Sequence, residues 1–505
     1  MEMESLLFRR QYILGPEYVE WLKGWNRTEI TPELFLTSHP DLPVITFRDG
    51  SKVIAVLGFV LDPLYPERND EQILRSMSSQ MFTTEDLFKM VDTMGGRYVL
   101  IGGVGGNLVA LNDSAGFRQL FYSKDTLGRV WCAGQPSLIS EKCGNQVNPQ
   151  IRNELFSLPL FTKSVEYWYP DKFTLYEDIF QLLPNHYLEL KSAEVKRYWP
   201  REEIRPYSFD TCTEYVCSVV RGMVESAINR FDLALALTAG LDSRIILSAC
   251  RDFPHRLLYF AHTHNNLSDG DPDVVIPSEM LSDLGLSYNL VKHVGCIDPQ
   301  FENLMYRNVP TARMNKICNS YTMHLFFKKY GRELVVVNGV GGEMTRNFYF
   351  VPSSIKLHGA LLAKIAFMEK SPLAREAFAR WLKEARQVVG HHNHILDLFY
   401  WEQRMGSWAA MSYSEYDISF ESLSPLNCRK LIEVTMGVKP ELRNPPGFKL
   451  HKAIISRMWP QLLKWDINPA PNRFRAVLRK FKRSQAHSFL KTVKMLPYSE
   501  KIRKV

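Results

Sequence analysis

Residues 233–244 read Leu-Ala-Leu-Ala-Leu-Thr-Ala-Gly-Leu-Asp-Ser-Arg, and this stretch decides the fold. The apolar run 233–237 predicts a buried parallel strand, because a strand covered on both faces is apolar without alternation. The small residues 238–240 end that strand. A helix is expected to start at 242–244, since apolar residues follow directly at 245–247. The stretch therefore predicts a strand, a tight turn and a helix.

The predicted turn carries the groups that a pyrophosphate site needs. Backbone N–H groups that converge beside the positive end of a helix bind anions. The hydroxyls of Thr238 and Ser243 add donors, and Arg244 adds positive charge. Asp242 adds a carboxylate through which a hard cation could bridge to phosphate oxygens. An ordinary turn between strand and helix is the alternative, and the Gly-Lys-Ser/Thr of a Walker loop is missing. The residues expected to bind ATP or pyrophosphate here are Leu237, Thr238, Ala239, Gly240, Asp242 and Ser243.

A second glycine-rich loop, 338–343, follows the apolar run 334–337 and has the sequence Asn-Gly-Val-Gly-Gly-Glu. Its glycines would let the backbone approach a ligand closely. Glu343 offers a second carboxylate, so Asp242 and Glu343 together could hold Mg²⁺ against ATP phosphates. The alternative is a simple turn with Glu343 at a helix start. Three residues of this loop are candidate ATP ligands, namely Asn338, Gly339 and Gly341, and His262 after the strand 257–260 is a candidate contact to the adenine base.

Length and composition describe a globular protein of more than one domain. The chain has 505 residues, of which 45% are hydrophobic and 23% charged, so two or three domains are expected. Eight cysteines form no C-x-x-C pair, which is typical of reduced thiols in a cytoplasmic protein. No apolar window of about 20 residues predicts a membrane span, and the acidic start predicts no signal peptide.

The net charge of +8 is concentrated at one end of the chain. Residues 473–505 hold eleven basic residues and a single acidic one, Glu500. A solvated terminal helix is the favoured interpretation of this basic tail, and docking to nucleic acid or anionic lipid is the alternative. The remainder of the chain carries no basic excess, so we expect no specific nucleic-acid partner.

Two parts of the chain differ in their patterns. Residues 1–200 show short strand-like runs separated by Gly, Asn and Pro, which predict a sheet-rich domain. The polar segment 201–206 is the expected linker. Residues 208–505 alternate helix and strand, which predicts a parallel sheet with ligands at the carboxyl ends of its strands. From about residue 355 onward the pattern is helical.

The stretch 238–244 resembles the Ser-Gly-Gly-Leu-Asp-Ser loop of the pyrophosphate-loop ATP pyrophosphatases, which cleave ATP between its α and β phosphates. The second part as a whole resembles the synthetase domain of asparagine synthetase. There, 338–343 stands at the place of Ser-Gly-Glu-Gly-(Ala/Ser)-Asp, and 424–429 is similar to Val-Pro-Phe-Leu-Asp-His-Arg. Residues 449–460 are similar to that family's Lys-x-x-Leu-Arg helix, which ends in Pro.

The first part resembles the glutaminase domain of the same family. Residues 95–98 and 111–122 match its Gly-x-(Phe/Tyr)-Ala and Ala-Arg-Asp-x-x-Gly-x-(Arg/Lys)-Pro-Leu-(Tyr/Phe)-Tyr stretches, and 178–186 match Gly-Ile-x-x-(Leu/Val)-x-Pro-Gly-His. The resemblance implies an α/β protein of two domains. These are an N-terminal Ntn-hydrolase-like αββα sandwich over 1–200 and a C-terminal parallel-sheet ATP-pyrophosphatase domain over 208–505, extended by helices.

The departures from the family pattern bear on activity. That glutaminase needs an N-terminal cysteine as nucleophile, and here position 2 is Glu2, so glutamine hydrolysis is expected to be absent. Val340 replaces a glutamate that assists the attack of ammonia. The family's Arg-x-Lys after the proline is also missing. The predicted catalytic residues are therefore Arg244, Lys464 and, more weakly, Lys449.

These observations together predict an ATP- and Mg²⁺-dependent ligase that forms an amide bond. A small-molecule or peptide carboxylate would be adenylated and then transferred to ammonia or an amine. A nucleotide-binding pseudoenzyme and a scaffold of the same fold are the alternatives. The identity of the carboxylate stays open, and a homodimer is compatible with the sequence.

Overall fold

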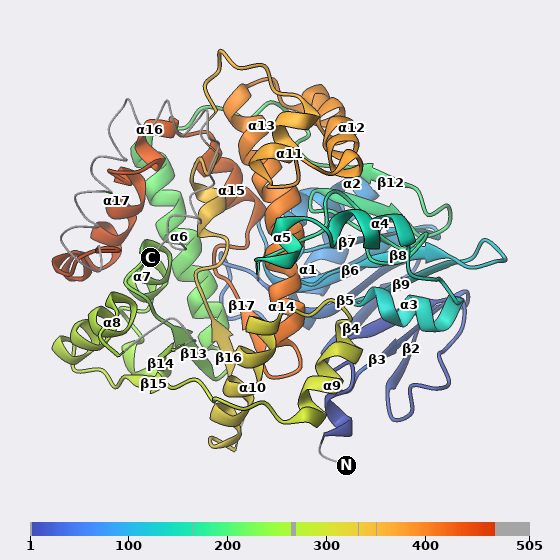
Figure 1. Ribbon diagram of the computed structural model, residues 1–505, viewed down its shortest axis with the longest axis horizontal. Coiled ribbons are helices and arrows are strands. Elements are labelled where there is room, and N and C mark those ends of the chain that lie inside the picture. Colours follow the sequence, from blue (N-terminus) through green and yellow to red (C-terminus); the bar gives the residue numbers. More distant parts are fainter. Residues whose placement is uncertain (1–2, 165, 264–268, 332, 350, 470–505) are drawn as a thin grey trace.

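The computed structural model describes residues 3–469 except 165, 264–268, 332 and 350 (Figure 1). Its first part contains two six-stranded antiparallel sheets. The first sheet consists of β1 (Tyr12–Gly15), β2 (Asn26–Thr31), β3 (Leu34–Ser38), β8 (Phe121–Lys124), β9 (Val130–Ala133) and β10 (Phe180–Gln181). The second consists of β4 (Val44–Asp49), β5 (Lys52–Leu61), β6 (Gly95–Val104), β7 (Asn107–Asn112), β11 (His186–Glu189) and β12 (Val195–Arg197).

The two sheets pack face to face, with helices on their outer faces. Leu14 and Leu36 of the first sheet share one hydrophobic core with Leu57 and Ile101 of the second. Helix α3 (Pro136–Cys143) packs on the outer face of the first sheet. Helices α1 (Asp70–Gln80) and α2 (Thr84–Val91) pack on the outer face of the second, and the short helices α4 (Pro149–Leu155) and α5 (Pro159–Thr162) follow. The expected αββα sandwich is therefore confirmed.

The second part contains a five-stranded parallel sheet in the order β15-β14-β13-β16-β17. Its strands are β13 (Leu233–Ala236), β14 (Leu257–His262), β15 (Asn289–Val291), β16 (Val335–Val337) and β17 (Glu421–Leu423). Leu233 and Leu235 face one core with α6 (Phe209–Ile228), α7 (Leu241–Ala249) and α17 (Lys449–Met458). Ala234 faces another core with α10 (Met314–Lys328). Burial of both faces explains the unbroken apolar run, and the predicted α/β class is confirmed.

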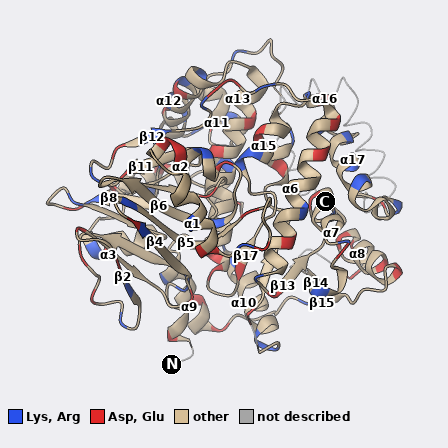
Figure 2. Ribbon diagram, turned by 180° about the vertical axis from the view of Figure 1, so that it is seen from behind, with Lys and Arg blue, Asp and Glu red and all other residues tan. Residues whose placement is uncertain are grey.

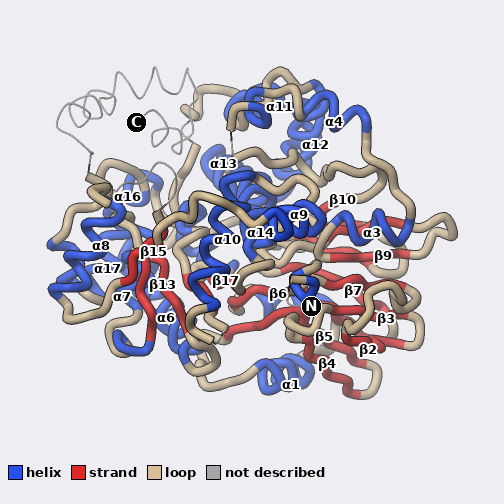
Figure 3. The backbone as a smooth tube through the Cα atoms, turned by 60° about the horizontal axis from the view of Figure 1, so that its bottom comes forward, coloured by secondary structure: helices blue, strands red, loops and turns tan. Residues whose placement is uncertain are grey.

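Helices α8 (Pro272–Asp283) and α9 (Pro299–Asn308) complete the connections of this sheet. From Gly359 onward the described chain is mostly helical, as expected from about residue 355, except for the short edge strand β17. This region contains α11 (Gly359–Ile365), α12 (Pro372–Val388), α13 (His392–Phe399), a π-helical turn (Tyr400–Ala409), α14 (Ala410–Tyr416), α15 (Arg429–Met436) and α16 (Pro440–Arg443). Several of these helices extend the core on the outer face of the second antiparallel sheet. Sandwich and parallel sheet thus lie side by side (Figure 3).

Buried charges join the two parts. Arg97 of the sandwich donates to both carboxylate oxygens of Asp417, at 2.9 Å for one of them, and to Glu421 at 2.6 Å. Arg118 donates to the other oxygen of Glu421 at 2.7 Å. All four side chains are buried. Across the rest of the described chain, acidic and basic residues are interspersed (Figure 2).

The predicted terminal helix in the basic tail 473–505 lies outside the described residues. All eight cysteines are free thiols. Among the helices of the described part, none is both long and apolar enough to cross a membrane.

Candidate functional site

The two glycine-rich loops lie against each other at one edge of the parallel sheet. Strands β13 and β16 are neighbours, so the loops that follow them emerge at the same edge. A Cβ atom on Gly339 would lie 2.7 Å from the backbone carbonyl carbon of Asp242. A Cβ on Gly342 would come nearer still to the Asp242 carboxylate, and Gly341 has a φ of +100°. The glycines therefore allow a close approach that no other residue would permit.

This approach brings the carboxylates of Asp242 and Glu343 together. Asp242 Oδ1 and Glu343 Oε2 are both buried, and neither has a hydrogen-bond partner among the described residues. Burial raises the pKa of Asp242 to about 6, the charge of Glu343 adds to that shift, and the charge of Arg346 opposes it. Two carboxylate oxygens that lack a donor fit a hard divalent cation, which prefers such ligands. The binding of Mg²⁺ by Asp242 and Glu343 stays a prediction, and their two unpartnered oxygens are compatible with it.

Arg346 is part of this site, although sequence reasoning missed it. Its side chain is 11% exposed and donates to Asp242 Oδ2. The guanidinium also lies 5.7 Å from the ring centroid of Phe448. The signal that could have revealed it is its position three residues after Glu343, directly after the short 3-10 helix Gly342–Thr345. A cation therefore already stands beside the predicted metal ligands.

The backbone amides of the first loop are present as predicted, but protein groups occupy them. The Thr238 N–H donates to Ser243 Oγ at 3.2 Å, and the Gly240 N–H donates to Thr238 Oγ1 at 3.1 Å. The Ala239 N–H donates to Asp273 Oδ1 at 2.8 Å, from the first turn of α8. Phosphate oxygens would have to replace these partners. Asp273 is a second residue that sequence reasoning did not identify.

Arg244 is not placed as a phosphate ligand in this structure. Its side chain is fully buried, and its guanidinium donates to the carbonyl oxygens of Ala239, Leu462, Trp465 and Asp466 at 2.7–3.3 Å. Burial lowers its pKa to about 10. Three of these bonds tie α7 to the segment after α17, and the fourth reaches back to the first loop. These contacts support a positioning role, and the catalytic role of Arg244 stays a prediction.

The two lysines predicted to be catalytic are both exposed. Lys464 ends the 3-10 helix Pro460–Lys464, and Lys449 begins α17. The structure therefore leaves their predicted roles without a supporting contact. The chain just after Lys464 does contact the first glycine-rich loop, because the Asn468 N–H donates to the Ala239 carbonyl oxygen at 3.1 Å.

The remaining predicted ligands are fixed by neighbouring groups. Asn338 Oδ1 accepts a hydrogen bond from the Tyr413 hydroxyl at 2.8 Å and another from the Val340 N–H at 3.1 Å. His262 is the last residue of β14, and its ring meets that of His293 edge-on at 6.4 Å. Leu237 is buried in the core. Asn338 thus helps to shape the second loop, and His262 lies at the expected edge of the sheet.

Comparisons with known proteins give only distant similarities. No family model and no curated protein matches the chain. One similar solved structure is the U34-tRNA thiolase NcsA from Methanococcus maripaludis with its [4Fe-4S] cluster, with a TM-score of 0.24 and 11% identity over 59% of this chain and 80% of that chain. Another is the glutamine phosphoribosylpyrophosphate amidotransferase from B. subtilis complexed with ADP and GMP, with a TM-score of 0.25 and 10% identity over 67% and 77%. A third is an allosteric regulatory enzyme of purine biosynthesis, with a TM-score of 0.25 and 9% identity over 74% of each chain. Similarities this weak carry no argument about activity, so a functional assignment depends on the geometry of the site.

Proposed function

We propose that this chain is an ATP- and Mg²⁺-dependent ligase that adenylates a carboxylate and transfers the acyl group to ammonia or an amine, in the manner of asparagine synthetases. One observation supports the proposal above all others. Two glycine-rich loops at the carboxyl ends of adjacent parallel strands bring Asp242 and Glu343 together, each with a buried carboxylate oxygen that lacks a partner among the described residues.

The proposed reaction has two steps. A carboxylate oxygen of the substrate attacks the α-phosphorus of ATP, and the bond from that phosphorus to the bridging oxygen of the β-phosphate breaks. Pyrophosphate leaves, and the acyl-adenylate remains. The nitrogen of ammonia or of an amine then attacks the acyl carbon, loses a proton, and displaces AMP.

The side chains at the sheet edge have defined parts in this proposal. Asp242 and Glu343 would hold Mg²⁺, which supplies positive charge to the phosphate oxygens when it is bound. The hydroxyls of Thr238 and Ser243 would donate to the phosphates. Arg346 would neutralise the charge that develops on the departing pyrophosphate.

The test is the exchange of labelled pyrophosphate into ATP in the presence of a panel of carboxylates. We expect exchange with at least one acid, amide formation on addition of ammonia or an amine, and no amide formation with glutamine alone. Asp242→Asn should lower exchange at least about 100-fold, because the neutral amide is a poor Mg²⁺ ligand. The matched control is Asp252→Asn, at an exposed position just beyond α7. Exchange that survives Asp242→Asn in a folded protein would contradict the metal role.

Two alternatives each have one observation in their favour. The side chain of Val340 cannot accept a proton, which favours a nucleotide-binding pseudoenzyme. The Asp273 carboxylate accepts the Ala239 N–H that a phosphate oxygen would need, which favours a scaffold. Calorimetry with ATP and Mg²⁺ separates the candidates. Binding without exchange for any acid supports the pseudoenzyme, and failure to bind nucleotide supports a scaffold.

A further inference from the structure

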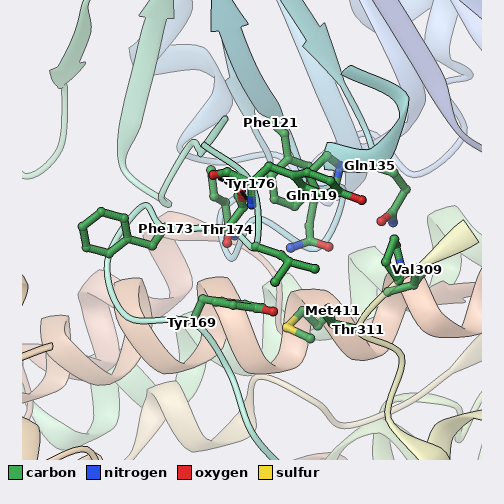
Figure 4. A pocket seen from close by; sticks show the side chains of 14 residues that line it. Gln119, Phe121, Gln135, Tyr169, Phe173, Thr174, Tyr176, Val309, Thr311 and Met411 are labelled. Carbon is green, nitrogen blue, oxygen red and sulfur yellow. Dashed lines mark hydrogen bonds between the residues drawn. The ribbon is translucent and has the colours of Figure 1, made fainter. Parts of the chain in front are cut away.

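A cleft at one edge of the sandwich is separate from the two glycine-rich loops. It is lined by residues of the edge strands β10 and β12 and of helix α12, and it encloses about 420 Å³. That volume lies within the usual range of small-molecule sites. The neighbouring cavity in Figure 4, which shares Gln181 with the cleft, encloses only about 40 Å³ and has room for water alone.

Three polar side chains line the cleft from the sandwich. Tyr122 is 7% exposed, and its hydroxyl has no hydrogen-bond partner among the described residues. The Nδ1 of His186 donates to the Pro184 carbonyl at 2.9 Å, which leaves the unprotonated Nε2 to accept a hydrogen bond. Burial raises the pKa of Asp171 to about 6, so this carboxylate is mostly charged at neutral pH. An ammonium group has three N–H donors and would meet an acceptor from each side chain.

The rim of the cleft carries charges of both signs. Lys172 and Arg380 are exposed and form no ion pair with the described residues, and Glu384 adds an exposed carboxylate. The charge of Arg197, which also lines the cleft, is already compensated by Glu402 at 2.9 Å. Two uncompensated positive charges therefore stand with two carboxylates. A ligand with one charge of each sign matches this arrangement better than a ligand with a single charge.

The rest of the lining fits an apolar group. Leu183, Val195, Trp381 and Val388 contribute to the wall. Trp381 is 2% exposed, and its Nε1 donates to Glu402 at 2.8 Å, which fixes the ring in place. An aliphatic side chain would bury apolar surface against these residues.

We propose that this cleft binds a zwitterionic α-amino acid with an apolar side chain. Its ammonium group donates to Asp171, His186 and Tyr122, and its carboxylate pairs with Lys172 and Arg380. The site is independent of the proposed adenylation, because none of the residues assigned to ATP or Mg²⁺ lines the cleft. The N-terminal segment, where the glutaminases that this chain resembles carry their nucleophile, does not line it either.

The test uses the full chain and three probes that share one carbon skeleton. L-Leucine is the zwitterion, 4-methylpentanoate lacks its ammonium group, and 3-methylbutylamine lacks its carboxylate. In calorimetric titrations at neutral pH we expect L-leucine to bind and each of the other two to bind at least about tenfold more weakly.

Substitutions test the two ends of the ligand separately. Asp171 has a φ of +54°, a conformation that asparagine tolerates, so Asp171→Asn should fold and weaken L-leucine binding about tenfold or more. Asp178→Asn is the matched control, because Asp178 is exposed and has a φ of +55°. The double variant Lys172→Gln/Arg380→Gln changes two exposed side chains. It should weaken L-leucine about tenfold and leave 3-methylbutylamine no weaker.

Three results would overturn the proposal: no binding of L-leucine, binding of 4-methylpentanoate as tight as that of L-leucine, or undiminished binding to Asp171→Asn. Equal weakening of L-leucine and 3-methylbutylamine in the double variant would also contradict it, because the two cations would then not bind the carboxylate. Pyrophosphate exchange should be unchanged in Asp171→Asn, so this outcome and that of the proposed adenylation can be told apart.

Discussion

Arg244 illustrates how one buried side chain can serve the frame of a site rather than its chemistry. The sequence places a positive charge beside the predicted phosphate loop, and in the structure that charge faces four backbone carbonyls. Arginine suits this task because its planar guanidinium presents five donors in fixed directions. Nothing in the local sequence reveals the acceptors, since three of them lie more than 200 residues away.

Replacing Arg244 should therefore destabilise the fold. Arg244→Met removes a donor from four carbonyls, three of which have no other donor among the contacts described above, and we expect a loss of roughly 3–5 kcal/mol in the free energy of unfolding, measured with urea. Arg244→Lys keeps the charge but cannot bond all four carbonyls, so it should recover only part of the loss. If both variants unfolded like the unmodified chain and lost only pyrophosphate exchange, Arg244 would be a catalytic residue after all.

A buried histidine predicts a dependence of stability on pH. Burial lowers the pKa of His186 to about 4, and the charge of Arg197 adds to this effect. The ordinary pKa of histidine is about 6.5, so this side chain is protonated below that pH in the unfolded chain. In the folded chain it becomes protonated only below about pH 4. Stability should therefore fall as the pH drops from 6.5 to 4, with at most about 3 kcal/mol from this residue. The slope should flatten in His186→Gln and persist in His255→Gln, which changes an exposed histidine.

At the scale of elements, the strand, loop and helix that begin at Leu233 could be predicted because local signals agree. The apolar run, the small residues and the helix start all point to one structure. Strand β17 had no such signal. It has three residues, and the charge of its Glu421 is compensated by Arg118 and Arg97 from the other part of the chain. Contacts between residues this far apart in sequence cannot be predicted from the local sequence pattern around β17.

The close approach of the two loops makes Gly339 the most sensitive position between them. The Cβ of Gly339→Ala would overlap the Asp242 backbone and push the loops apart. We expect a loss of roughly 1–3 kcal/mol in stability and about 100-fold in pyrophosphate exchange, because such misplacement separates Asp242 from Glu343. Gly390→Ala is the control, since a Cβ there would meet no atom within 4 Å. Normal exchange in Gly339→Ala would show that the contact between the loops is dispensable.

At the scale of the whole molecule, the division into a sheet-rich part and an alternating part could be predicted, but their union could not. Composition and periodicity describe each part alone. Asn427 shows what they miss, because its amide donates to the Gly96 carbonyl and to Asp113 in the sandwich. The same side chain accepts the Ala115 N–H through its Oδ1. The sequence resemblance identifies the segment 424–429, yet only the structure shows that one of its residues joins the two parts.

The buried cluster of Arg97, Arg118, Asp417 and Glu421 should make the two parts unfold together. Burial opposes ionisation of Glu421, but the charges of Arg118 and Arg97 outweigh it and lower its pKa to about 2. Arg97→Met should cost roughly 3–5 kcal/mol, because it leaves buried carboxylates undercompensated. Calorimetry should show one transition for the unmodified chain and an earlier, separate one for the variant. Arg27→Met, which breaks an exposed pair with Glu20, should change little, and a similar loss there would refute the special role of the cluster.

The pairing of Arg346 with Asp242 has a consequence for the order of events at the sheet edge. Under the proposed function, Mg²⁺ alone would have to displace Arg346 from Asp242, and ATP alone would have to displace Asp242 from Arg346. When both bind together, Asp242 binds Mg²⁺ and Arg346 binds the triphosphate, so neither side chain is left without a partner of opposite charge. Titrations should therefore show strong synergy, with the nucleotide sharpening the affinity for the ion and the ion sharpening the affinity for the nucleotide by the same factor.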